Sequence, residues 1–187
     1  AAMYLVLRKF GKAGLLGPLT GAGIRSFAAL GCMQGVTTAT DLVNKLTEQD
    51  CEVLEATLAE PDCGIRLIPA FQAFHGTHAA PLGAEHVKRL MPRSTDKLRY
   101  GLVKMTLDGS IQGFTSRMRW PGHFNGAPNG IWVMAPAQYE ADFETYHRAG
   151  LQIHTHTNGD EASAVAIDAI ERVLARAARS DHRHTLQ

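Results

Sequence analysis

Hydrophobic and polar positions follow two alternating periods along the chain, which predicts strands and helices in turn. Apolar residues recur at the helical spacing i, i+3, i+4, i+7 in 22–34, 47–60, 83–91, 136–149 and the segment after Asp160. Short apolar or β-branched runs separate these segments, at 35–43, 63–71, 100–107, 151–157 and 182–187. This order predicts an α/β fold with parallel strands and right-handed crossovers.

Local signals refine the expected ends of several elements. Thr47 and Asp50 have the spacing of a capping box at the start of one helix. Asp160 stands where the N-cap of the last helix belongs. Pro69 has no backbone N–H, which predicts that its strand ends early or bends. The first helix is expected to bury an apolar face of Ile24, Phe27, Ala28 and Leu30.

Residues 108–135 form a long segment rich in Gly, Pro and Asn without any clear period. Loops of this length in compact domains are usually functional or disordered. Because Trp120, Phe124 and Trp132 can anchor the segment, we expect an ordered functional loop.

The pattern leaves a doubly wound sheet and a piece of a barrel as alternatives. No GxGxxG or GxxxxGK[ST] motif supports nucleotide binding, and GAG at 21–23 is only a partial match. Both folds place their active sites at the carboxyl ends of parallel strands, so those ends are where we expect the chemistry.

Composition and charge exclude several classes of protein for this chain. The chain has 187 residues, a net charge of +1 and 45% hydrophobic residues, which is typical of one ordered domain. The balanced charge argues against a nucleic-acid partner, and no apolar run reaches the length of about eighteen residues that a membrane span requires. The three cysteines form no CxxC pair, so we expect no disulfide framework and a cytoplasmic location.

The histidine-rich segment 151–157 is one candidate site. Alternation places His154 and His156 on one strand face, directly before an Asn158-Gly159-Asp160 turn. Imidazole suits zinc and similar divalent metals, so this face is a candidate for metal binding. The alternative is two polar side chains at a solvated strand end.

Lys104 is the second candidate, because it falls in the middle of a predicted parallel strand, on one face with Leu102, Thr106 and Asp108. A buried ammonium group is costly unless it is paired or neutralised. Lys104 therefore either forms a salt bridge with Asp108 or Asp41, extends to the strand end, or has a lowered pKa. A lysine of lowered pKa serves as a base, a Schiff-base former or a carboxylated metal bridge.

Four segments resemble motifs of the amidohydrolase superfamily, in the amidohydrolase family 3 branch that includes N-substituted formamide deformylase. LVKMTLDGSIQGFT at 102–115 resembles its fourth-strand motif and LQIHTHTNGDEA at 151–162 its fifth. GVTTATDL at 35–42 is similar to the second strand, and HRHTLQ at 182–187 to the lead-in to the sixth.

The resemblance implies part of a TIM (β/α)8 barrel, roughly strands 2 to 5. It implies a metal-dependent hydrolase that cleaves amide-type C–N bonds in small molecules through a metal-activated water, with one or two divalent ions, zinc being expected. Lys104 matches the lysine that the family carboxylates to bridge two metals, and His156 matches the fifth-strand ligand. His154 falls on no ligand position.

Residues near these two ligands are expected to contact substrate or support the site. This group comprises Asp108, which could orient Lys104, together with His154, Asp160, Arg117 and Trp120. Arg119 and Asn125 on the long loop could also touch substrate, with loop packing as the alternative role.

The family's first-strand HxH pair and its eighth-strand aspartate have no counterpart here, and residues 1–34 contain no histidine. We therefore expect residues 1–187 to be an internal part of a larger barrel, with 1–20 as a peripheral lead-in and no catalytic residue certain. The alternative is a non-catalytic α/β fragment that pairs its open sheet edges in a homo-oligomer or with missing barrel segments. A third hypothesis is a Schiff-base lyase with Lys104 as its nucleophile.

Overall fold

The computed structural model describes residues 18–73 and 80–187, in two compact units. One unit contains residues 18–39 and 46–66, and the other contains 40–45, 67–73 and 80–187. Most of the expected lead-in, residues 1–17, lies outside the described part of the chain.

The smaller unit is built on helices α3 (Gly21–Met33) and α4 (Glu48–Leu58). The capping box predicted for α4 is present, since Thr47 Oγ1 accepts from the Asp50 N–H and the Asp50 carboxylate accepts from the Thr47 N–H. The apolar face predicted for α3 was half wrong. Ile24 and Ala28 are buried, whereas Phe27 and Leu30 are 51% and 64% exposed. Only the i, i+4 pair faces inward on this helix.

One sheet contains all five strands, in the order β1-β2-β3-β4-β5. Neighbouring strands from β2 to β5 are parallel. A doubly wound sheet reverses its strand order at a switch point, whereas a barrel adds strands in sequence. The uninterrupted order therefore identifies an α/β fold of the part-barrel type. The strands are Thr38–Asn44 (β1), Arg66–Gln72 (β2), Leu102–Thr106 (β3), Gln152–His156 (β4) and Thr185–Leu186 (β5).

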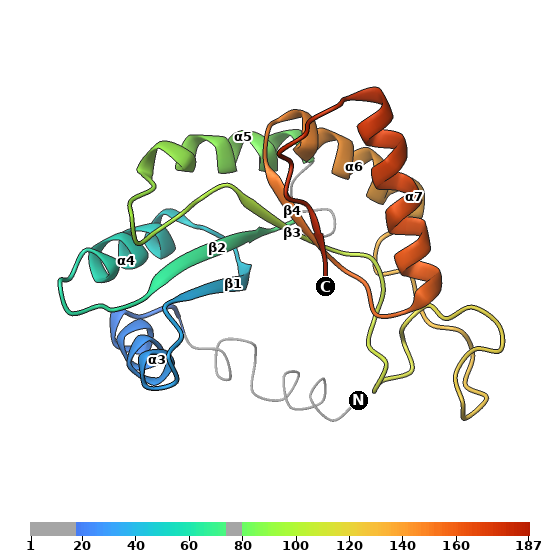
Figure 1. Ribbon diagram of the computed structural model, residues 1–187, viewed down its shortest axis with the longest axis horizontal. Helices are drawn as coiled ribbons and strands as arrows, with labels where there is room; N and C mark the ends of the chain where they lie inside the picture. Colours follow the sequence, from blue (N-terminus) through green and yellow to red (C-terminus); the bar gives the residue numbers. More distant parts are fainter. Residues whose placement is uncertain (1–17, 74–79) are drawn as a thin grey trace. The chain divides into compact units, whose positions relative to one another are not determined.

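The helices of the larger unit lie along one side of β3 and β4 (Figure 1). The buried Tyr139 hydroxyl of α6 is 2.9 Å from Thr155 Oγ1 on β4, so α6 covers the face from which Ile153 and Thr155 project. None of the described helices combines the length and apolar character needed to cross a bilayer. These helices are α5 (Ala80–Leu90), followed by the short 3-10 helix η1 (Met91–Arg93), α6 (Pro136–Arg148) and α7 (Asp160–Arg176).

Two expectations about element ends were wrong. Strand β2 continues through Pro69 to Gln72. Pro69 falls between the Leu67–Leu98 bridge and the ladder that starts at Ala70, so the pairing is interrupted at the proline but the strand continues. The N-cap of α7 is Gly159 and not Asp160, which is the first helical residue. A carboxylate in the first helical turn is still favourable to the helix dipole.

Candidate functional site

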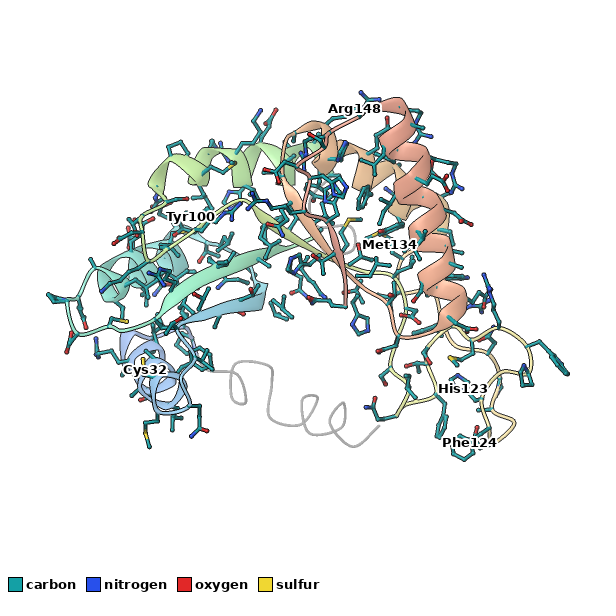
Figure 2. All side chains as sticks on the ribbon, viewed as in Figure 1. Cys32, Tyr100, His123, Phe124, Met134 and Arg148 are labelled. Carbon is teal, nitrogen blue, oxygen red and sulfur yellow. The ribbon has the colours of Figure 1, made fainter. Side chains whose placement is uncertain are left out.

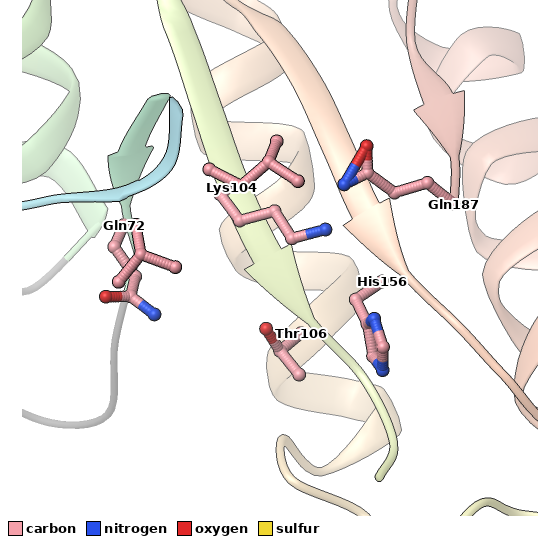
Figure 3. Close-up of a pocket in the computed structure, with 7 residues that line it drawn as sticks. Gln72, Lys104, Thr106, His156 and Gln187 are labelled. Atoms are coloured by element: carbon pink, nitrogen blue, oxygen red, sulfur yellow. The ribbon is translucent and has the colours of Figure 1, made fainter. Parts of the chain in front are cut away.

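A pocket of about 600 Å³ opens at the carboxyl ends of the strands in the larger unit. Gln72, Thr106 and His156 are the last residues of β2, β3 and β4, and Lys104 lies one side-chain repeat earlier on β3. This is the position at which parallel α/β folds bind their substrates. The pocket is lined by Leu42, Val43, Gln72, Lys104, Thr106, His156 and Gln187 (Figure 3).

The strand register arranges the pocket side chains in rows across the sheet. Gln72 is paired with Lys104, and Lys104 with His154, while Thr106 is paired with His156 one step further along. Residues paired in this way project from the same face of adjacent strands. The sheet thus brings the two predicted metal ligands, Lys104 and His156, to one face of one pocket (Figure 3).

Lys104 is the least expected group on this face. It is only 6% exposed, and no ion pair among the described residues includes it. Lys104 therefore does not form, among the described residues, the salt bridge to Asp41 or Asp108 that the sequence allowed. Burial lowers the pKa of the Lys104 ammonium to about 8. The neutral amine, which is the nucleophilic form, is thus accessible near neutral pH.

His154 lies beside Lys104 in the same row. Its Nε2 is 3.2 Å from Gln152 Nε2, whereas its buried Nδ1 has no hydrogen-bond partner. Burial is the main cause of its lowered pKa, an interaction with the Gln187 side chain opposes that shift, and the nearby Lys104 charge adds to it. Burial thus favours the neutral form of the His154 ring, whose Nδ1 has no hydrogen-bond partner among the described residues.

Asp108 has a structural role in this arrangement. Its side chain is 0% exposed, and both carboxylate oxygens accept backbone N–H groups. Oδ1 accepts from Asn158 over 2.9 Å, and Oδ2 accepts from Arg117 and Gly159 over 2.9 and 2.8 Å. Asp108 therefore ties the start of the long loop to the turn between β4 and α7.

The remaining predicted residues lie on the long loop or at the start of α7. Arg117 donates to Gly130 O and Glu161 Oε1 and covers the Trp132 ring at 4.9 Å. Asp160 Oδ1 accepts from the Arg119 backbone N–H over 2.8 Å. Trp120 is 92% exposed, and neither it nor these other two lines the pocket.

The long loop is tied to α7, but not through two of the three aromatic anchors expected, since Trp120 and Phe124 are 92% and 94% exposed. Asn129 as well as Arg117 bonds to Glu161, and buried His123 contacts the Ser116 carbonyl. His123 and Phe124 are neighbours on this loop, yet only His123 is buried (Figure 2). Asn125 accepts the N–H of Ala127 within the loop.

Sequence reasoning missed most of the other pocket residues, including Gln72 and Gln187. Both are polar residues at the carboxyl end of a predicted apolar strand, the same signal that singled out His156. Their side chains carry no ionisable group, so their chemistry did not identify them as candidate site residues.

Comparison with solved structures identifies two proteins that share this fold. An uncharacterized metal-dependent hydrolase from Pyrococcus furiosus aligns with 90% of this chain at a TM-score of 0.66 and 21% identity. One from Pyrococcus horikoshii OT3 aligns with 82% of it at a TM-score of 0.60 and 19% identity. The chain shares their fold. It spans about a third of their length, 35% and 31% respectively. No family model and no curated protein matches the chain.

Proposed function

We propose that this chain is the part of a metal-dependent hydrolase barrel that contributes Lys104 and His156 to the metal centre. The observation that carries the proposal is a buried lysine of lowered pKa with no described counter-ion, on the same pocket face as His156. The fold shared with two metal-dependent hydrolases supports it.

The donor chemistry of the pocket fits part of a metal centre. An ammonium group has no lone pair, but carboxylation of Lys104 would replace the buried cation with an anion that offers two oxygen ligands. His156 adds an imidazole. Among the described residues, no group of three or more His, Cys, Asp or Glu side chains is placed to hold a metal ion, so further ligands would have to come from elsewhere.

The finer proposal follows the family resemblance. We propose zinc as the metal and amide-type C–N bonds of small molecules as the substrates. When bound, the metal would polarise the scissile bond and provide a nucleophile from water at neutral pH. The chain's own residues would hold that metal through Lys104 and His156, and Gln72 and Gln187 would line the space beside it.

Incorporation of ¹³C-bicarbonate tests the role of Lys104 without relying on turnover. We expect a carbamate ¹³C signal in the 187-residue chain with Zn²⁺, and its loss in Lys104→Ala. Exposed Lys88 provides the matched control, so Lys88→Ala keeps the signal. Hydrolysis of N-formyl and N-acyl compounds is measured on the same samples. A chain that takes up neither bicarbonate nor Zn²⁺ would contradict the proposal.

The same lysine would serve a Schiff-base lyase, so one further measurement separates the two chemistries. Borohydride treatment with carbonyl compounds should leave Lys104 unmodified when the metal is bound, because a carbamate nitrogen is not nucleophilic. Stable trapping of a substrate on Lys104 under those conditions would favour the lyase.

A further inference from the structure

Two polar atoms contact Nε2 of the His156 ring. His156 Nε2 is 3.1 Å from the carbonyl oxygen of Gly109 and 3.1 Å from the side-chain nitrogen of Asn158. The same Asn158 nitrogen donates to Gly109 O over 2.8 Å. Asn158 thus fixes the carbonyl against which the imidazole rests.

This geometry determines which ring nitrogen carries the proton. A carbonyl oxygen only accepts hydrogen bonds, and its two lone pairs can accept from Asn158 and His156 together. If Nε2 lacked its proton, its lone pair would face that of the carbonyl at 3.1 Å, while the Asn158 amide nitrogen, also 3.1 Å from Nε2, already directs a proton at Gly109 O. Nε2 is therefore protonated, and the lone pair of the neutral ring lies on Nδ1, which bonds to none of the described residues.

Asn158 is itself held from behind by Asp108. The fully buried Asp108 carboxylate accepts the backbone N–H of Asn158 and that of Gly159. Gly159 is needed at this turn because a Cβ there would collide with the Arg117 backbone. These contacts hold the β4–α7 turn in place, with the Asn158 side chain pointing back to His156.

We infer that Asn158 is a positioning residue: its side chain, held by Asp108, fixes the His156 ring so that Nδ1 is the atom free to bind a divalent metal. This inference rests on the proposed function. Histidines that bind metals commonly donate their other ring N–H to a carbonyl, and losing such outer partners typically lowers metal affinity about 10–100-fold.

Nitrogen NMR of the ¹⁵N-labelled 187-residue chain tests the inference, since long-range correlations identify the protonated nitrogen of each ring. We expect His156 to be protonated on Nε2 alone in the metal-free wild type. In Asn158→Ala we expect a mixture of tautomers and an affinity for Zn²⁺, followed at His156, that falls about 10–100-fold. Gln138→Ala is the control, because Gln138 is exposed and its side chain bonds to Asp142 on its own helix.

The possible outcomes separate this inference from the proposed function. A wild-type His156 protonated on Nδ1 would overturn the inference, even if Asn158→Ala fails to fold. An Asn158→Ala variant with an unchanged tautomer and an unchanged affinity for Zn²⁺ would also overturn the inference, but it would not contradict the proposed metal centre. If Zn²⁺ leaves wild-type His156 unaffected, the proposed function fails, whereas a tautomer change in Asn158→Ala would still support the positioning of the ring.

Discussion

Two groups of histidines lie at opposite ends of strand β4 and differ in how fully their hydrogen bonds are satisfied. At the amino end, His147 Nδ1 is 2.8 Å from His184 Nε2, and His147 Nε2 is 2.7 Å from the Ala177 carbonyl. The Ile153 N–H donates to His184 Nδ1 over 3.1 Å. Each of the four ring nitrogens thus has a partner inside the protein.

Polar groups in the carboxyl half of the same strand and beside it lack hydrogen-bond or ion-pair partners. His154 Nδ1 is buried without a partner, His156 Nδ1 is unbonded in the described structure, and Lys104 has no described counter-ion. Buried polar groups are normally satisfied, and a functional site is one of the places where incomplete ones occur. The histidines therefore differ in their bonding: His147 and His184 complete hydrogen bonds inside the protein, whereas His154 and His156 each leave one ring nitrogen without a described partner.

Removing one histidine from each end of β4 should change stability by different amounts. His147→Ala leaves the His184 Nε2–H and the Ala177 carbonyl unsatisfied, so we expect the free energy of unfolding to fall by about 3 kcal/mol. His154→Ala removes a ring that already lacks a partner at Nδ1, so we expect a loss of no more than about 1 kcal/mol. Urea unfolding measures both, and equal losses would contradict the comparison.

Acid should affect the amino end next most strongly. Ile153 and His147 fix His184 as neutral, and burial, followed by the charges of neighbouring His182, His147 and Arg179, lowers its pKa from 6.5 to about 3. Burial also lowers the pKa of His147. The unfolded chain therefore binds more protons below pH 6.5, and stability is lost as the pH falls below that value.

From His184 alone we expect a loss of about 2 kcal/mol between about pH 7.5 and about pH 5. Urea unfolding across this range measures it, with His184→Gln as the comparison. A variant whose pH dependence matches the wild type would show that His184 is not the titrating group.

The contrast also explains what the sequence could predict. Period-two alternation correctly placed Ile153 and Thr155 on one face of their strand and His154 and His156 on the other. It also placed Lys104 and Thr106 on one face, because side-chain direction in a strand depends only on local geometry. The capping box at Thr47 was predictable because it also depends only on residues close together in the sequence.

Contacts between distant residues could not be read from these patterns. Asp108 and Asn158 are 50 positions apart, and His147 and His184 are 37 apart. Only the strand order and register bring each pair together, and that order also decided between a barrel and a doubly wound sheet. The N-cap at Gly159 was missed because the Asp160 carboxylate accepts from Arg119, a long-loop residue, as well as from Glu161.

The smallest expected effect tests the carboxyl end by removing its unpaired charge. Lys104→Met keeps a chain of similar shape and removes a buried ammonium, so we expect the metal-free protein to gain about 1–2 kcal/mol of stability at neutral pH. The folded-state pKa of Lys104 is about 8 and its ordinary value is 10.5, so the cost of the charge is fully present below pH 8. The advantage of methionine should shrink as the pH rises from about 8 to 10.5.

Urea unfolding in EDTA and carbonate-free buffer measures the gain, and exposed Lys88→Met, as the control, should change stability by less than about 0.5 kcal/mol. A Lys104→Met variant less stable than the wild type would mean that the lysine is paired within the protein, and the two ends of β4 would then no longer differ.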